Sequence, residues 1–164
     1  MIETDSAAIE QCAKLLTDKK LTIAFAESAT AGSLSAAFSK LPDAGSFLKG
    51  GLVCYDACLK EDILGVPDTL IKQYSPESTE VTRAMALGLK KWMQADVYVA
   101  ITGLTRSGGS ESKVKPVGTM FYCLVQNDRI YSCNECFHGN EDAIISQTIE
   151  QISKSIVKFL TSKN

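Results

Sequence analysis

This 164-residue sequence has only one histidine. It also lacks a large excess of charge of one sign and a long apolar run. Seventeen Lys and Arg residues face nineteen Asp and Glu residues, which leaves a net charge of −2. A chain that grips a polyphosphate backbone needs a positive excess, so we expect no nucleic-acid partner. No apolar segment approaches the ~20 residues of a spanning helix, so we expect no membrane partner either.

The N-terminus, Met1-Ile2-Glu3-Thr4-Asp5, has neither the basic nor the apolar region of a signal peptide. We therefore expect a cytoplasmic protein. The composition is 45% hydrophobic and 22% charged, which is typical of an ordered globular protein. Neither a repeat nor a linker-like segment divides the chain, so residues 1–164 are expected to form one domain.

Six cysteines are an even number, but a domain of this size has no need of a disulfide framework. Most of them lie inside apolar runs, so we expect small buried hydrophobic residues. Cys133 and Cys136 have the spacing of half a zinc site, but no second pair exists. On a strand their odd separation turns the two side chains to opposite faces, so we predict no metal site.

Helices and short apolar strands alternate along most of the chain, with a hairpin near its end. We predict helices at 9–16, 33–41, 56–64, 76–92 and 140–160, and strands at 21–26, 50–55, 97–102, 120–125 and 130–137. Asp5 and Ser6 are possible caps of the first helix, Asp56 is placed to cap the third, and Ser75-Pro76 has the form of a cap followed by proline. This order predicts a three-layer α/β/α domain around a mixed β-sheet.

Open sheets of this kind bind ligands beyond the carboxyl ends of their strands. Three segments with polar residues converge on that edge in the predicted fold, namely 27–32, 55–60 and 102–119. We expect the functional residues in these segments.

Ser28 lies where a buried strand is predicted to turn into a helix. Backbone N–H groups at a helix start, with the positive end of the helix dipole behind them, can stabilise an oxyanion, and they suit a phosphate or carboxylate equally well. The neighbouring Ala29, Ala31 and Gly32 are small and keep the approach open. A simpler interpretation is that Ser28 or Thr30 only caps the helix, a position that Ser and Thr favour.

A serine nucleophile needs a base, and the sequence offers two candidates. The only histidine, His138, lies near the end of the last predicted strand. A lysine can serve instead if burial or a positive dipole keeps its amine neutral, and Lys60 lies early in a predicted helix that supplies such a dipole. An isolated lysine is, however, more often an exposed surface charge. Tyr55 ends the preceding strand and can orient the amine, bind substrate or simply pack.

The predicted loop from Gly103 to Lys115 is glycine-rich and basic, with Arg106, Lys113 and Lys115. Such a loop can fold over a phosphate-bearing ligand. The alternative is a solvated, mobile loop without a ligand.

Several short motifs occur in register over about residues 5–160. They are Ala26-Glu27-Ser28 with Thr30 and Gly32, Gly50-Gly51-Leu52-Val53 with Tyr55 and Lys60, Leu64-Gly65-Val66-Pro67, Ala95-Asp96, Thr102-Gly103 and Lys115-Pro116-Val117-Gly118-Thr119. Their order and spacing resemble the C-terminal deamidase domain of the CinA family.

The resemblance implies a nicotinamide mononucleotide amidohydrolase, which releases nicotinic acid mononucleotide and ammonia in pyridine nucleotide recycling. It implies a small-molecule nucleotide substrate, no metal or other cofactor, and a homo-oligomer, with a dimer favoured. The family's nucleophilic serine falls on Ser28, and its Tyr-x-x-x-x-Lys segment falls on Tyr55 and Lys60. The residues expected to contact substrate are Ala29, Thr30, Gly32, Thr102, Gly103, Arg106, Lys115, Gly118 and Thr119.

The chain departs from the family pattern within the expected pocket. The changed positions are Ala29 and Ala31 for a cysteine and a glycine, Ala57 for an asparagine, Arg106-Ser107 for glycine-proline, and Gly139-Asn140-Glu141 for Gly-Asp-Arg. The last change replaces a cation with an anion. Two alternatives therefore remain: a relative that has lost catalysis and binds a nucleotide or a protein partner, and an enzyme that hydrolyses another amide.

Overall fold

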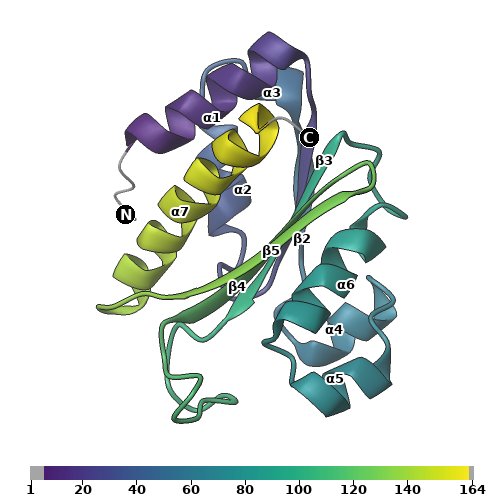
Figure 1. The fold of residues 1–164 in the computed structure, drawn as a ribbon, viewed down its shortest axis with the longest axis vertical. Helices are drawn as coiled ribbons and strands as arrows, with labels where there is room; N and C mark the ends of the chain where they lie inside the picture. The colour runs from purple at the N-terminus through teal and green to yellow at the C-terminus, as the bar shows by residue number, and fades with distance from the viewer. Residues whose placement is uncertain (1–5, 163–164) are drawn as a thin grey trace.

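A single mixed sheet of five strands, in the order β2-β1-β3-β4-β5, forms the centre of the computed structural model, which describes residues 6–162 (Figure 1). The parallel strands are β1 (Ile23–Glu27), β2 (Leu48–Val53) and β3 (Val97–Gly103). The antiparallel strands are β4 (Thr119–Gln126) and β5 (Arg129–Cys136). β1 is buried throughout its length, as expected for a strand with helices on both faces.

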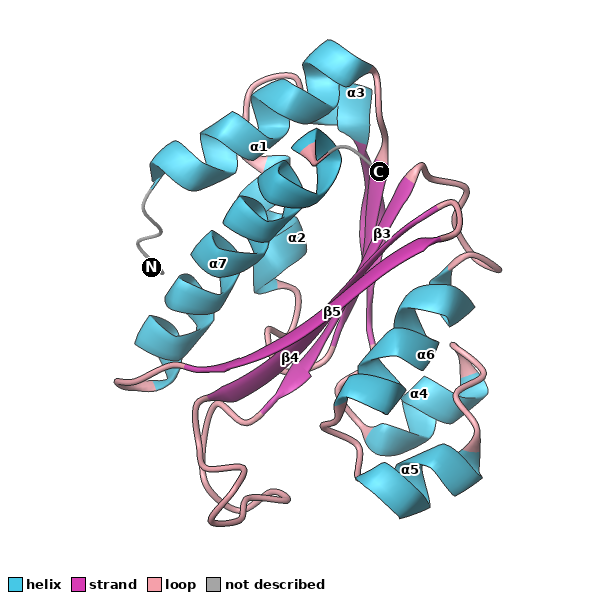
Figure 2. Ribbon diagram, viewed as in Figure 1, coloured by secondary structure: helices cyan, strands magenta, loops and turns pink. Residues whose placement is uncertain are grey.

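Helices cover both faces of the sheet (Figure 2). One face carries α1 (Ser6–Lys19), α2 (Ser33–Ser39), α3 (Ala44–Phe47) and α7 (Glu141–Thr161). The other face carries α4 (Ala57–Asp62), α5 (Asp68–Tyr74) and α6 (Thr79–Leu89). Two apolar cores result, one on each side of the sheet, and the alternating side chains of β1 and β3 divide between them. The predicted three-layer α/β/α fold is confirmed.

Local signals place several elements well. The hairpin turns at Asn127 and Asp128, with Gln126 opposite Arg129, as predicted. Helix α7 begins after Asn140, whose side chain accepts from the Ala143 N–H at 2.9 Å. The predicted cap at Asp5 lies outside the described residues.

The predicted helix start at Ser75-Pro76 is wrong. Helix α6 begins at Thr79, and the Ser78 side chain accepts from the Val81 N–H at 3.3 Å. Ser75 instead is the C-cap of α5, with φ 72. A residue before proline is disfavoured in the α-helical region, so α5 does not continue through Ser75. Helices α3 and α5 were not predicted. Helix α3 has only four residues, and α5 has no buried side chains, so neither shows a clear apolar pattern.

All six cysteines are free. Cys12, Cys54 and Cys123 are buried as expected, but Cys58 and Cys136 are exposed, and for these two the prediction is wrong. Cys136 ends β5, which lies at the edge of the sheet. None of the helices between residues 6 and 162 is both long and apolar enough to cross a membrane.

Gly118→Ala should lower the free energy of unfolding by roughly 3 kcal/mol. Gly118 has φ +96, and an added Cβ would lie 2.0 Å from the Phe137 carbonyl oxygen, so strain and collision combine. Gly108→Ala is the matched control, since Gly108 has the same φ of +96 but no atom within 4 Å of an added Cβ. Its cost should be only about 1 kcal/mol in urea unfolding; equal losses in the two variants would contradict the collision.

Candidate active site

A cavity of about 270 Å³ opens at the carboxyl ends of the parallel strands. All three segments expected at this edge contribute to it. Its lining residues are Ser28, Ala29, Tyr55, Glu77, Gly103, Leu104, Thr105, Arg106, Ser107, Gly108 and Gly109. Glu77 comes from the connection between α5 and α6, which was not predicted to take part.

The turn that carries Ser28 is held by the carboxylate of Glu27, which is completely buried at the end of β1. Five hydrogen bonds reach this carboxylate from the residues that follow it. The donors are Thr30 Oγ1 at 2.6 Å, the N–H groups of Gly32 and Leu34 at 3.0 Å, the Ser35 N–H at 2.8 Å and Ser35 Oγ at 2.5 Å. Glu27 therefore takes the place of a helix cap.

This arrangement corrects two expectations about the turn. Gly32 is the N-cap of α2 and makes no side-chain capping bond, so neither Ser28 nor Thr30 caps the helix. The first helical amides are also not free to bind an anion, since Leu34 and Ser35 donate to Glu27. Within this turn, the backbone N–H groups of Ala29 and Thr30 have no acceptor among residues 6–162.

Ser28 is 5% exposed and lines the cavity. Its backbone N–H donates to the Ile101 carbonyl at 3.0 Å, which fixes the turn against β3. Its hydroxyl has no hydrogen-bond partner within the described part of the chain. Three residues later Ala31 adopts φ 47, a left-handed conformation that favours glycine. The turn thus keeps a strained shape at a residue other than glycine.

Lys60 is buried in α4, with 1% of its surface exposed. Burial lowers its pKa from the usual 10.5, and the carboxylate of Glu77 opposes this shift most strongly. No carboxylate oxygen of residues 6–162 lies within 4.0 Å of the Lys60 amine. The amine is therefore buried without an ion-pair partner.

The helix dipole does not explain the lowered pKa of Lys60. Asp56 caps α4 as predicted and accepts from the Cys58 N–H at 3.0 Å, but the helix has only six residues. Lys60 lies in its last turn, where a dipole favours a cation. Burial alone is the cause that favours the neutral amine.

Arg106 lines the cavity. Its guanidinium lies 3.2 Å from a carboxylate oxygen of Glu141, the first residue of α7, and 3.5 Å from the Tyr55 hydroxyl. The Thr105 hydroxyl donates to the same Glu141 oxygen at 3.3 Å. Tyr55 is 53% exposed, so its ring forms part of the cavity wall that faces solvent.

Several predicted residues lie outside the cavity lining. Thr30, Gly32, Lys60, Thr102, Lys115, Gly118 and Thr119 do not line the cavity. Thr102 Oγ1 lies 2.8 Å from Thr82 Oγ1, and Thr119 Oγ1 donates to the Pro116 carbonyl at 2.7 Å. His138 also lies outside the cavity lining. Residues 6–162 hold no group of three or more His, Cys, Asp and Glu residues suited to a metal ion.

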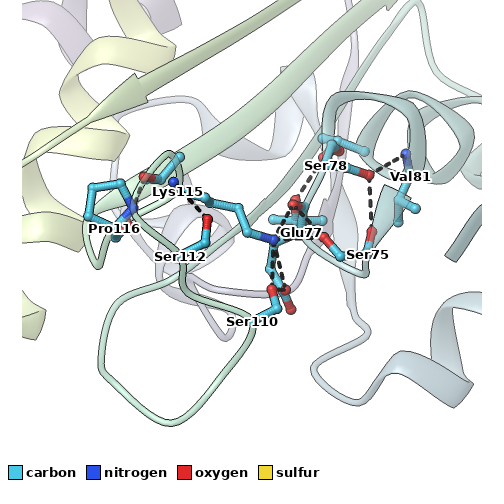
Figure 3. Close-up of polar contacts among 11 residues, drawn as sticks. Ser75, Glu77, Ser78, Val81, Ser110, Ser112, Lys115 and Pro116 are labelled. Atoms are coloured by element: carbon cyan, nitrogen blue, oxygen red, sulfur yellow. Dashed lines mark hydrogen bonds and ion pairs between the residues drawn. The ribbon is translucent and has the colours of Figure 1, made fainter. Parts of the chain in front are cut away.

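Lys115 fastens the 104–118 loop to the connection between α5 and α6 (Figure 3). Its amine donates to Ser75 Oγ at 2.7 Å, to Ser110 Oγ at 2.7 Å and to the Glu77 carbonyl at 3.1 Å. It also lies 3.8 Å from the Glu77 carboxylate, to which Ser110 donates. Lys113 is exposed.

Two residues of the candidate site were missed from the sequence. Glu27 could have been noticed in the sequence, because it directly follows an apolar strand. A carboxylate buried at such a position needs hydrogen-bond donors nearby. No local sequence pattern identifies Glu77, because its neighbours in space come from a loop more than 30 residues further along the chain.

Comparison with known proteins identifies the family. The model of the CinA C-terminal domain matches residues 5–160. A competence-damage inducible protein of Desulforamulus reducens is 36% identical over 160 residues, and a CinA-like protein of Thermotoga maritima is 33% identical over 159. Both matches cover 97% of this chain and 38% of the relative, so the chain spans little more than a third of the length of these relatives. The crystal structure of competence damage-inducible protein A from Klebsiella pneumoniae, at 21% identity, has the same fold with a TM-score of 0.92, covering 99% of this chain and 100% of that chain.

Glu27→Gln should lower the free energy of unfolding by roughly 3 kcal/mol, because charge-assisted hydrogen bonds are lost and an amide NH₂ faces backbone donors. Urea unfolding at pH 7 measures the change. Glu10→Gln, at an exposed position of α1, is the control and should stay within about 0.5 kcal/mol of the wild type. A Glu27→Gln protein as stable as the control would show that the turn does not depend on this carboxylate.

Proposed function

The chain belongs to the CinA C-terminal domain family, and from this premise we propose that it is a nicotinamide mononucleotide amidohydrolase with Ser28 as nucleophile and Lys60 as base. The proposal rests mainly on the unpaired hydrogen-bonding groups of the Ser28 turn. An unbonded serine hydroxyl faces a cavity, directly beside two unbonded backbone N–H groups, those of Ala29 and Thr30. A nucleophile and donors for an oxyanion are the minimum that acyl transfer requires.

The reaction begins when the neutral amine of Lys60 accepts the proton of the Ser28 hydroxyl. The serine oxygen attacks the carboxamide carbon, and the N–H groups of Ala29 and Thr30 bind the negative oxygen that forms. The C–N bond then breaks, and the Lys60 ammonium returns its proton to the departing ammonia. Water hydrolyses the acyl-serine to give the carboxylic acid and restores Ser28.

Arg106 is the cation that we assign to the substrate phosphate. It lines the cavity and its side chain is 66% exposed, so a ligand can reach it. Guanidinium groups bind phosphate through two parallel hydrogen bonds, which fixes the orientation of the ligand. Tyr55 lies next to Arg106 and offers a ring face to the nicotinamide or ribose.

We further propose that the enzyme works in the cytoplasm and, on the family resemblance alone, that it is a homodimer. Analytical ultracentrifugation of the purified chain tests the second point. A sedimentation coefficient of a 17.7 kDa monomer at micromolar concentration would contradict it.

Ser28→Ala should abolish the release of ammonia from nicotinamide mononucleotide, because no other group replaces the attacking oxygen. A coupled ammonia assay measures the rate. Ser39→Ala is the control, since Ser39 is exposed at the end of α2 and its loss should leave the rate unchanged. A folded wild type without activity would overturn the proposal for this substrate.

Calorimetry then separates the alternatives. Saturable binding of the mononucleotide without turnover would identify a relative that has lost catalysis, whereas ammonia release from another small carboxamide in a panel would identify a different amidase.

Glu141→Gln should strengthen binding of nicotinamide mononucleotide roughly two- to fivefold, because an exposed ion pair of modest strength no longer competes for Arg106. Binding of nicotinamide riboside, which lacks the phosphate, should not change. Asp142→Asn makes the same change of net charge one residue further along α7 and should leave both affinities as they are. Calorimetry with the Ser28→Ala protein gives the constants; an equal gain for both ligands would rule out competition at Arg106.

A further inference from the structure

Among the residues that the structure describes, Glu77 is the acidic residue in the lining of the Ser28 cavity, and Arg106 is the basic one. Glu77 comes from the connection between α5 and α6, and Arg106 comes from the loop between β3 and β4. The side chain of Glu77 is 18% exposed, so it is neither sealed in the core nor free in solvent. A ligand in this cavity therefore meets a hydrogen-bond acceptor as well as a cation.

The two oxygens of the Glu77 carboxylate have different surroundings. Oε2 accepts from the Ser110 hydroxyl and lies 3.8 Å from the Lys115 amine (Figure 3). Oε1 has no hydrogen-bond donor within the described part of the chain. Every fully buried polar side-chain atom of residues 6–162 has a hydrogen-bond partner, so the unbonded Oε1 must be accessible. One oxygen thus holds the side chain in place, and the other is left to accept from a ligand.

The ion pair with Lys115 suits this acceptor to a hydroxyl rather than to a cation. The Lys115 amine lies near the Glu77 carboxylate and also donates to the Glu77 carbonyl. The charge of the carboxylate is therefore balanced inside the protein, and the ammonium repels a second cation. A hydroxyl needs only a free lone pair, and its hydrogen bond to a carboxylate is stronger than one to a neutral acceptor.

We propose that Glu77 is a specificity-determining residue that accepts a hydrogen bond from a ribose hydroxyl of the substrate through Oε1. The choice of a mononucleotide rests on the proposed function, in which Arg106 binds the phosphate. The ribose connects the ring to the phosphate and carries two neighbouring hydroxyl donors. When an analogue lacks the donor, an acceptor of low exposure is left unpaired, so the analogue binds less tightly. The cavity therefore selects ribonucleotides over their deoxy forms.

Calorimetry with the Ser28→Ala protein measures this selection without turnover. Nicotinamide mononucleotide is compared with its 2′-deoxy and 3′-deoxy analogues. Loss of the hydroxyl that Glu77 binds should weaken binding roughly 10-fold, but less than about twofold once Glu77→Ala is added. Glu77→Gln keeps the length of the side chain with a neutral acceptor, and the same comparison should give about threefold.

Two controls separate the acceptor from the attachment of the loop. Ser110→Ala removes the hydrogen bond to Oε2 but keeps the carboxylate, so the preference for the hydroxyl should remain even if all ligands bind less tightly. Glu80→Ala makes the same change of charge at an exposed position of α6 and should leave every affinity as it is. A purely structural Glu77 would give Glu77→Ala the same loss for ribose and deoxyribose ligands, and that result would overturn the inference.

Ribose 5-phosphate and its 2-deoxy and 3-deoxy forms extend the test to ligands without a carboxamide. A preference for ribose 5-phosphate that disappears in Glu77→Ala, in a protein that releases no ammonia, would sink the proposed function and support this inference. An active wild type whose preference for the hydroxyls does not depend on Glu77 would sink this inference alone. Absence of binding by all of these ligands would overturn both.

Discussion

The buried carboxylate of Glu27 is the constraint around which the candidate site is arranged. A carboxylate removed from water costs several kcal/mol unless donors compensate it, and here five donors within the next eight residues do so. The chain after β1 must therefore wrap around this group, which brings Ser28 to the cavity wall. The same arrangement requires glycine at position 51 in β2. A Cβ there would lie 2.2 Å from the Ser35 hydroxyl that donates to Glu27.

The burial of Lys60 opposes stability. Because burial makes the pKa of Lys60 lower in the folded than in the unfolded chain, the unfolded chain binds this proton more tightly. The cost to folding is therefore largest below the folded pKa and falls as the pH rises toward 10.5. Groups that work as bases near neutral pH commonly carry such a cost.

Periodicity and turn chemistry predict the fold well but the site only in part. The apolar runs that become β1 and β3 and the Asn140 cap of α7 are local signals, and they place the layers and the sheet edge correctly. Three segments that meet at the cavity follow from that edge. The contacts of Glu77 and of Arg106 with Glu141 do not follow, because they join residues more than 30 positions apart whose side chains show no periodic pattern.

The cavity draws its walls from the β1–α2 turn, the end of β2, the α5–α6 connection and the loop between β3 and β4. No short piece of the chain contains enough of it to hold a ligand, so the pocket exists only after distant parts of the sheet have paired, which is a late and slow event in folding. A bound ligand would bridge these four segments. Ligand binding would then stabilise the protein against global unfolding more than against fraying of any one helix. The affinity for the ligand would therefore depend on the whole fold being intact.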